Sequence, residues 1–175
     1  RRGSQSFNQE MQIDSAYFAQ SLGWHHQAIN TAAQAKAWQH YQLRFPNLYS
    51  EQFEQQASAA KYSNHWPANW PYAIARQESA FASDAQSGAG AMGLMQILPS
   101  TAREVARKKN VKYQRSKLFN ADYNIVLGSG YLKQLNKRYQ HRALTSAAYN
   151  AGPRRANTWL KNMEQPLPID AWIET

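Results

Sequence analysis

The sequence of 175 residues contains no cysteine, which excludes a disulfide framework and a thiolate nucleophile. It also lacks any apolar run close to the ~18 residues that a transmembrane helix needs, so we expect no membrane span. The first residues, Arg1-Arg2-Gly3-Ser4, carry no apolar core of a signal peptide. Because a mature secreted protein has lost its signal peptide, this absence does not indicate a cytoplasmic protein.

Acidic residues are few: 11 Asp and Glu stand against 20 Lys and Arg, and the formal net charge is +9. This excess predicts an anionic partner, and nucleic acid, an anionic membrane surface and an acidic cell-wall polymer all fit. Aromatic residues, by contrast, make up 13% of the chain. Exposed aromatic rings suit sugar faces and stacked bases alike, so composition by itself does not decide between these partners.

Helical spacing of apolar residues dominates the chain up to residue 62. The residues recur in three groups, which are Phe7, Met11 and Phe18; Ala28, Ala32, Ala35 and Trp38; and Phe53, Ala57 and Ala60. Such amphipathic helices need a neighbour to bury their apolar sides. The composition changes at 63–69, which is polar and contains Pro67, so we place a boundary there. We expect a helical linker segment at 1–68 and a second domain at 69–175.

The second domain is also predicted to be mostly helical. Pro71 suits the first turn of a helix. Residues 86–98, in which glycines alternate with Met and Leu, are the one credible place for a small β element. Thr101 and Glu104 have the spacing of a capping box that starts another helix. Apolar spacing predicts three further helices, at about 125–139, 144–151 and 156–160. We therefore expect a mostly α fold.

Two patterns that suggest a cofactor have simpler explanations. Gly88, Gly90 and Gly93 match G-x-G-x-x-G, but the dinucleotide-binding form of this motif needs a preceding strand and a following helix. Here a helix precedes the glycines and a β-like segment follows them. The histidines show no metal-ligand spacing such as H-E-x-x-H. We therefore expect no cofactor and no metal.

A basic run lies within residues 103–117. Its members are Arg103, Arg107, Lys108, Lys109, Lys112, Arg115 and Lys117. Its helical part has no interleaved aromatic residues of the kind that stack on single-stranded bases. We interpret the run as a solvated helix face and loop, and we expect no nucleic-acid partner.

Glu78 ends an apolar run and precedes a glycine-rich turn. A carboxyl at a helix end among aromatic and aliphatic neighbours has its charged form disfavoured, so we expect a raised pKa. Such a carboxyl can protonate a glycosidic oxygen near neutral pH. Taken alone, Glu78 would more simply be a solvated residue at a helix end. Tyr149 and Asn150 close an Ala-rich helix, where they could orient an acetamido group or a catalytic carboxyl.

Together these segments resemble the catalytic domain of soluble lytic transglycosylases, the goose-lysozyme-like enzymes that cut bacterial peptidoglycan. The matching blocks stand in the family's order and spacing, and they are ARQESAF at 75–81, GLMQILP at 93–99 and AYNAGP at 148–153. Asn124-Ile125, Gly128 and Tyr131-Leu132 also resemble the family's middle helix. Residues 1–62 resemble the helical linker region that precedes this domain in the large doughnut-shaped members.

This resemblance implies a lysozyme-like fold in which Glu78 is the single catalytic acid/base. Glu78 would protonate the glycosidic oxygen between N-acetylmuramic acid and N-acetylglucosamine. It would then deprotonate the muramic C6 hydroxyl, whose attack on the anomeric carbon leaves a 1,6-anhydro product. The other implied site residues are Ser87, Met95, Gln96, Tyr149, Asn150 and Glu174. The first three would contact the glycan, the next two would orient the acid and the substrate, and the last aligns with an acidic position near the site.

The acidic residues agree with a route that uses one carboxyl group. Glycosidases with two catalytic carboxylates hold them about 5 Å or about 6.5–9.5 Å apart. Between residues 69 and 163 the acidic residues are Glu78, Asp84, Glu104 and Asp122. Asp84 is the partner nearest to Glu78 in sequence, and nothing around it indicates burial. A substrate-assisted route is therefore the simpler account.

The resemblance makes the glycan strands of peptidoglycan the expected partner, with cell-wall synthesis or remodelling enzymes as further partners, in the bacterial periplasm. Family chains normally continue past Trp172-Ile173-Glu174 into a segment that helps to close the site, whereas this sequence ends at Thr175. We therefore expect a C-terminally incomplete fragment or processed form that is weakly active or inactive.

Three other functions stay open at this stage. A hydrolytic muramidase of the same fold needs the same acid but uses water, and a second carboxylate near the anomeric carbon would favour it. A truncated, non-catalytic glycan-binding fragment fits the shortened end. A basic nucleic-acid-binding helical protein would leave Glu78 and the Gly-Leu-Met-Gln block unexplained.

Overall fold

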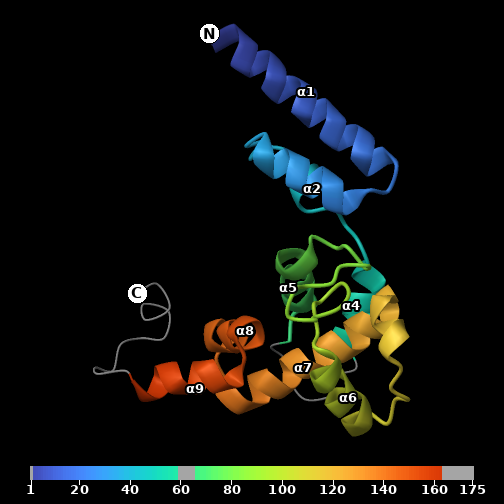
Figure 1. The fold of residues 1–175 in the computed structure, drawn as a ribbon, viewed down its shortest axis with the longest axis vertical. Helices are drawn as coiled ribbons and strands as arrows, with labels where there is room; N and C mark the ends of the chain where they lie inside the picture. Colours follow the sequence, from blue (N-terminus) through green and yellow to red (C-terminus); the bar gives the residue numbers. More distant parts are fainter. Residues whose placement is uncertain (1, 59–65, 163–175) are drawn as a thin grey trace.

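The computed structural model describes residues 2–58 and 66–162, which are mostly helical (Figure 1). The elements in chain order are α1 (Arg2–Ser21), α2 (His25–Gln34), α3 (Tyr41–Arg44), α4 (Ser50–Ser58), α5 (Asn69–Ser79), α6 (Pro99–Lys108), the 3₁₀ helix η1 (Arg115–Phe119), α7 (Ala121–Tyr139), α8 (Arg142–Ala151) and α9 (Pro153–Lys161). None of these described helices is both long and apolar enough to cross a lipid bilayer. The predicted mostly α fold is confirmed.

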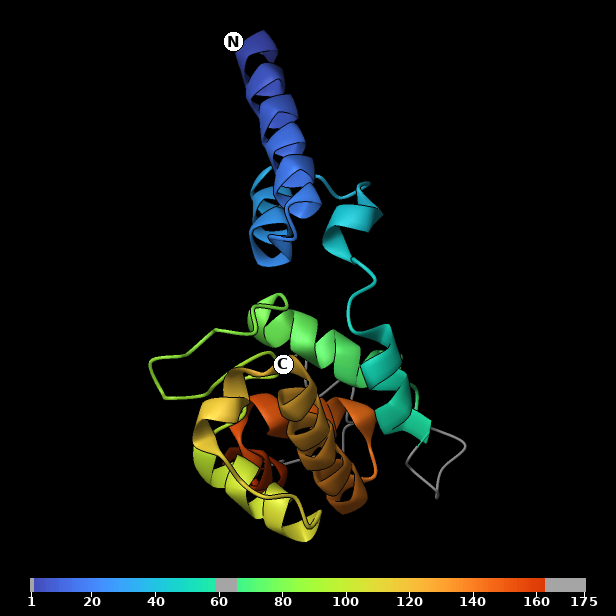
Figure 2. The same cartoon turned by 90° about the vertical axis from the view of Figure 1, so that its right-hand side faces the viewer.

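Helices α1, α2 and α3 form an N-terminal body at one end of the molecule, with few contacts to the other helices (Figures 1 and 2). Its core consists largely of alanine, with Ala16, Ala19, Ala28, Ala32, Ala35 and Ala37 packed beside Leu43. Such small side chains let the axes of α1 and α2 approach closely. Several large apolar side chains of this body face solvent instead, including Phe18 at 65% and Trp24 at 62% exposure.

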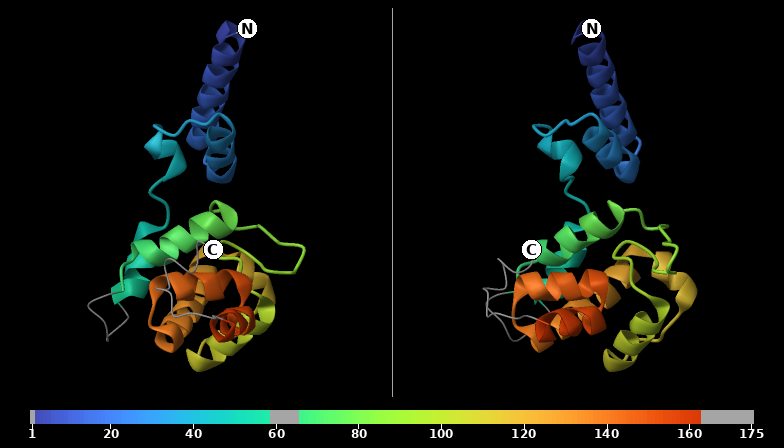
Figure 3. Two further views of the ribbon diagram at one scale, coloured as in Figure 1. Left: turned by 90° about the vertical axis from the view of Figure 1, so that its left-hand side faces the viewer. Right: turned by 60° about the vertical axis from the view of Figure 1, so that its left-hand side comes forward.

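Helix α7 runs through the C-terminal body, where α4, α5, α6 and α8 all contact it (Figure 3). Its Ile125, Leu132 and Leu135 are buried in a core that also contains Phe53 of α4 and Phe81, which follows α5. The long helix predicted from this apolar stripe is confirmed. Helix α4 thus packs with the C-terminal body, while the division between residues 68 and 69 stays a prediction.

The segment between α5 and α6 contains the small β element. Two isolated antiparallel bridges pair Gln86 with Met92 and Met92 with Ile97. Within this loop Gly93 has a left-handed φ of 74°, and a Cβ at this residue would lie 2.0 Å from the backbone oxygen of Leu118. Only glycine fits such a close approach with this φ. The glycines of the G-x-G-x-x-G pattern therefore belong to a tight loop that follows a helix.

Asn124 of α7 fastens this loop to the helix. Its side-chain nitrogen donates to the backbone oxygens of Met92 (2.9 Å) and Leu118 (2.7 Å). Its side-chain oxygen accepts a hydrogen bond of 2.7 Å from the backbone nitrogen of Met95. Because the amide is fully buried and makes all three bonds, the loop and the helix behave as one unit.

The capping box predicted at Thr101 and Glu104 is wrong. Helix α6 begins earlier, with Leu98 as its N-cap and Pro99 in the first turn, and no side-chain hydrogen bond caps it. Proline suits this position because its fixed φ is helical and its missing N–H would have no intrahelical partner there. Glu104 instead pairs with Lys108 one turn later, with 2.6 Å between the charged atoms.

Candidate active site

Glu78 occupies the last turn of α5. The helix ends at Ser79 because Ala80 and Phe81 both adopt left-handed conformations, with φ of 48° and 66°. Such values are unfavourable for residues other than glycine, so surrounding contacts must hold them. The Phe81 side chain is buried, and its ring centroid lies 4.9 Å from that of Tyr72. This anchored reversal ends the helix with the Glu78 carboxyl facing a cleft.

The cleft has a volume of about 500 Å³. It brings together five residues that the sequence predicts for the site, namely Glu78, Ser87, Gln96, Tyr149 and Asn150. They come from the end of α5, from the loop before α6 and from the end of α8. The fold thus assembles at one surface three segments that lie far apart in the chain.

The Glu78 carboxyl is partly buried, and this burial raises its pKa above that of an ordinary glutamic acid. A hydrogen bond with the side chain of Asn150 opposes part of the rise, because it stabilises the ionised form. The structure therefore agrees with the direction expected from the sequence. It also identifies Asn150 as the residue that contacts the carboxyl.

Tyr149 lines the cleft near Glu78. Its hydroxyl donates a hydrogen bond of 2.9 Å to the backbone oxygen of Met95, and its ring lies 5.3 Å from that of Tyr131. Burial, followed by the nearby Glu78 carboxylate, raises the pKa of the Tyr149 hydroxyl well above its ordinary value. The hydroxyl therefore stays protonated at neutral pH and joins α8 to the loop.

Ser87 and Gln96 shape the loop side of the cleft. The Ser87 hydroxyl accepts a hydrogen bond of 3.0 Å from the backbone nitrogen of Ala91, which closes a tight turn. The Gln96 amide nitrogen donates to the backbone oxygens of Ala85 (3.0 Å) and Gly93 (2.9 Å). Both side chains are thus held in place by hydrogen bonds within the loop that carries them.

Met95 lies beneath the cleft and is not part of its wall. Its side chain is fully buried against Gly128, where an added Cβ would lie 2.5 Å from the Met95 sulfur. Leu98, which is 43% exposed, is the largest aliphatic side chain among the described residues that line the cleft. The predicted contact between Met95 and a glycan remains untested, as does the role of Glu174, which lies outside the described residues.

Several cleft residues were not predicted from the sequence. Leu98, Thr101 and Glu104 line the cleft, and Tyr131 of α7 joins them. The first three are spaced by three residues, a spacing that places side chains on one face of a helix. With α6 starting at Pro99, this spacing was the sequence signal that could have revealed them.

Among the described residues Glu104 is the second carboxylate that lines the cleft, whereas Asp84 is exposed and does not line it. A hydrogen bond from Lys108 and its positive charge lower the pKa of Glu104, which is therefore ionised at neutral pH. The side chains of Glu104 and Lys108 are both about half exposed. In residues 2–58 and 66–162 no group of three or more His, Cys, Asp or Glu side chains is placed to hold a metal ion.

Family models match two parts of the chain. The transglycosylase SLT domain matches residues 55–169, and the soluble lytic murein transglycosylase L domain matches residues 3–40. The chain belongs to the transglycosylase SLT domain family. The two matches agree with the resemblance of the C-terminal part to the catalytic domain of this family and of the N-terminal part to its linker region.

Individual members of the transglycosylase family cover nearly all of this chain. A putative soluble lytic murein transglycosylase of Haemophilus influenzae is 40% identical over 164 residues, which are 93% of this chain and 27% of that protein. An inactive glutamate-to-glutamine mutant of the lytic transglycosylase Slt of Pseudomonas aeruginosa has a TM-score of 0.87 at 39% identity, over 95% of this chain and 26% of that one.

The 70 kDa soluble lytic transglycosylase of Escherichia coli has a TM-score of 0.83 at 32% identity, over 95% of this chain and 27% of that one. These two structures confirm the transglycosylase fold predicted from the resemblance. The chain spans about a quarter of the length of the relatives it matches.

Proposed function

We propose that the chain carries the catalytic site of a lytic transglycosylase, which cleaves the β-1,4 bond between N-acetylmuramic acid and N-acetylglucosamine without using water. The observation that carries the proposal is the partly buried Glu78 carboxyl of raised pKa, bonded to Asn150 in the cleft. Membership of the transglycosylase SLT domain family supports it. The inactive relative from Pseudomonas aeruginosa, in which a glutamate is replaced by glutamine, is consistent with an essential acid.

In the first step Glu78 acts as general acid. Burial keeps a larger fraction of the carboxyl protonated near neutral pH, so it can give its proton to the glycosidic oxygen as the bond to the anomeric carbon breaks. The N-acetylglucosamine part then leaves with a free hydroxyl group. The Asn150 amide stabilises the carboxylate that this transfer creates.

In the second step the Glu78 carboxylate acts as general base. It takes the proton of the muramic C6 hydroxyl, whose oxygen attacks the anomeric carbon and closes a 1,6-anhydro ring. The proton lost in the first step is thereby recovered, and no water enters the products. Ser87 and Gln96, which the loop holds on the cleft wall, would bind the sugar rings, and the Tyr149 ring would form the floor.

The substrate would be peptidoglycan of the bacterial envelope, and the compartment would be the periplasm. A formal net charge of +9 suits attraction to an acidic wall polymer. Interaction with cell-wall synthesis or remodelling enzymes stays a prediction from the resemblance. Raising the salt concentration should weaken binding to intact sacculi more than it slows cleavage of short soluble muroglycans, because surface charges are screened.

The test measures how much cleavage depends on Glu78 and which chemical ends the products carry. Glu78→Gln should lower cleavage by about 10²–10⁴-fold, because the amide keeps the shape without a transferable proton. Asp84→Asn, on an exposed residue away from the cleft, should cleave like the unaltered chain. Mass spectrometry should find 1,6-anhydro ends, each lighter by one water than a hydrolysed end. Equal turnover by Glu78→Gln would remove Glu78 from the mechanism.

A hydrolytic muramidase is the second candidate, and the position of Glu104 on the cleft favours it. A second ionised carboxylate could activate water, as in inverting glycosidases. The pairing of Glu104 with Lys108 opposes this role, because the charge is already compensated at the helix surface. Glu104→Gln should therefore change cleavage by at most about fivefold, as for other exposed ion pairs. A loss of about 10²-fold or more, with reducing ends on the products, would favour the muramidase.

A further inference from the structure

The N-terminal body touches the catalytic helix at its last turn. The backbone oxygen of Ser79 lies 2.9 Å from Nδ1 of His26 in α2. Nε of Arg76, one turn before Ala80, donates to the backbone oxygen of Arg44 at 2.6 Å, and the Arg76 guanidinium lies 4.5 Å from the ring centroid of Phe45. Figure 2 shows α2 above this end of α5. Both contacts are thus made within one helical turn of Glu78.

The bond between His26 and Ser79 requires a proton on Nδ1 of the imidazole. A backbone oxygen can only accept, so Nδ1 of His26 carries the proton and donates it to Ser79. In the neutral ring Nε2 is then an acceptor, and the side-chain nitrogen of Asn30 lies 3.1 Å from it. Asn30, one turn later in α2, therefore favours the tautomer that can donate to Ser79.

The end of α5 needs such support. Helix ends fray, and their last backbone oxygens have no partner within the helix. Beyond the helix, the Ser79 oxygen accepts a hydrogen bond of 3.1 Å from the backbone nitrogen of Ala82. Here two consecutive residues, Ala80 and Phe81, hold left-handed conformations directly after Ser79. The Ser79 hydroxyl donates to the backbone oxygen of Leu94 at 2.7 Å, which joins the same turn to the loop. Among the described residues, His26 makes the hydrogen bond to Ser79 that comes from the N-terminal body.

We propose that His26 is a positioning residue of the active site, which holds the Ser79 backbone and thereby the direction of the Glu78 carboxyl. The proposal rests on the proposed function. A catalytic group must be held within about 0.5 Å of its working position, so a loosened last turn would lower the rate of the chemical step. His26 is not among the described residues that line the cleft, so it would act without touching the substrate.

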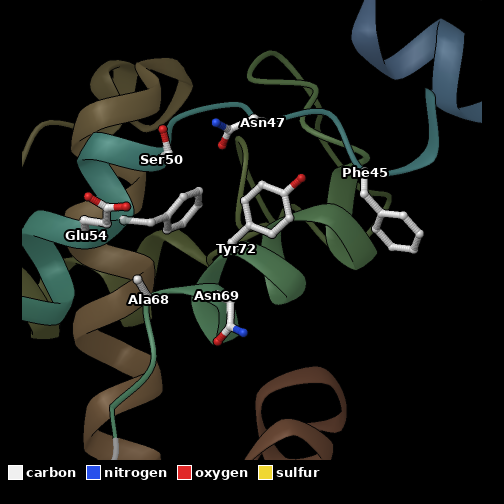
Figure 4. Close-up of a pocket in the computed structure, with 8 residues that line it drawn as sticks. Phe45, Asn47, Ser50, Glu54, Ala68, Asn69 and Tyr72 are labelled. Atoms are coloured by element: carbon white, nitrogen blue, oxygen red, sulfur yellow. The ribbon is translucent and has the colours of Figure 1, made fainter. Parts of the chain in front are cut away.

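The other contacts between the N-terminal body and α5 explain why the loss of one hydrogen bond should loosen this junction. The chain passes from the N-terminal body over α5, where the Tyr72 hydroxyl donates to the backbone oxygen of Pro46 at 2.5 Å. Beside this bond lies a cavity of about 380 Å³, lined by Phe45, Asn47 and Ser50 among others (Figure 4). This pocket is partly open to solvent, so apolar side chains do not fill this part of the junction. The rigidity of the junction depends on a few hydrogen bonds, of which the bond from His26 lies nearest to Glu78.

The test uses the full chain and three variants. His26→Ala should lower kcat on soluble muroglycan by about five- to tenfold, the effect of one lost hydrogen bond, with KM within about twofold. His26→Asn should recover most of the rate, because its side-chain nitrogen can occupy the place of Nδ1 and donate to Ser79. Gln27→Ala is the matched control, since Gln27 is exposed and its side chain bonds to Thr31 of the same helix.

Hydrogen exchange separates this proposal from the proposed function. In His26→Ala the backbone amides of residues 80–82 should exchange faster than in Gln27→Ala, with equal melting temperatures. If the unaltered chain cleaves no glycan, the proposed function fails, and the exchange result alone decides whether His26 holds the turn. An unchanged kcat in an active enzyme, an equal loss in Gln27→Ala, or exchange at 80–82 that does not respond would each overturn the proposal.

Discussion

The two bodies of the chain pack their side chains in opposite ways. In the N-terminal body alanines are buried, and large side chains such as Phe18 and Trp24 face solvent. In the C-terminal body large side chains are buried, together with polar ones such as Asn124 and Thr145. An alanine core holds helices at short range but removes little apolar area from water, so it contributes less stability than a core of Phe, Leu and Ile.

The two bodies also differ in how they use buried polar side chains. A buried polar group is costly unless it is hydrogen-bonded, and when all its bonds are made it specifies one arrangement of the chain. The C-terminal body uses Asn124 in this way to hold the loop that forms one side of the cleft. Among the described residues of α1, α2 and α3 the fully buried side chains are apolar. Buried hydrogen bonds that fix one arrangement of the chain are therefore found next to the cleft and not in the described residues of the N-terminal body.

The largest expected effect is that of Asn124→Ala, which removes the three buried hydrogen bonds at once. The free energy of unfolding should fall by about 3–5 kcal/mol, because three backbone groups lose their partner and a cavity is left. Lys137→Ala, on an exposed residue of the same helix, should stay within about 0.5 kcal/mol of the unaltered protein. Urea unfolding measures both. A loss below about 1 kcal/mol would mean that the loop does not depend on Asn124.

A smaller effect is expected in the N-terminal body. Ala32 is fully buried between close helices, so Ala32→Leu should destabilise this body by about 1–3 kcal/mol through overpacking. Ala33→Leu places the same side chain on the exposed face and should change stability by about 0.5 kcal/mol or less. Hydrogen exchange should increase in residues 8–44 and stay unchanged in 121–139. Faster exchange in both ranges would show that the two bodies unfold together.

The smallest effect concerns the charge of Glu78. Burial raises the pKa of Glu78 in the folded protein above its unfolded value, so its stabilising contribution is complete below the unfolded pKa and is lost as the pH rises through the folded pKa. Glu78→Gln avoids this loss. The variant should melt about 1–3 °C higher at neutral pH, because partial exposure limits the effect, and the gain should disappear below about pH 4. Calorimetry at both pH values measures it, and a gain independent of pH would contradict this account.

The helices and the raised pKa of Glu78 were predictable because local patterns determine them. The stripe of Ile125, Leu132 and Leu135 could be buried only by a helix, and α7 has that form. The raised pKa of Glu78 was predicted from its apolar neighbours, and its place in the site was predicted from the resemblance. The beginning of α6 was predicted wrongly because Thr101 and Glu104 imitate a cap, whereas Pro99 places the first turn before them.

The remaining features depend on contacts between distant segments. Met95 and Leu98 are both apolar residues of one short block, and only the packing of the loop on α7 decides that Met95 is buried and Leu98 faces the cleft. Asn124 looks like a polar surface residue until the loop is placed against it. The bond from His26 to Ser79 joins residues 53 positions apart, and no local pattern indicates it.

Because Gly128 has no side chain, Met95 can pack directly against α7. This contact sets how close the loop between α5 and α6 lies to the helix. A methyl group at residue 128 would lie 2.5 Å from the Met95 sulfur, so the loop would have to move away from α7. That loop carries Gln96 and supplies the oxygen that receives the Tyr149 hydroxyl. The loop side of the cleft is thus held by a close contact between Met95 and Gly128, neither of which lines the cleft.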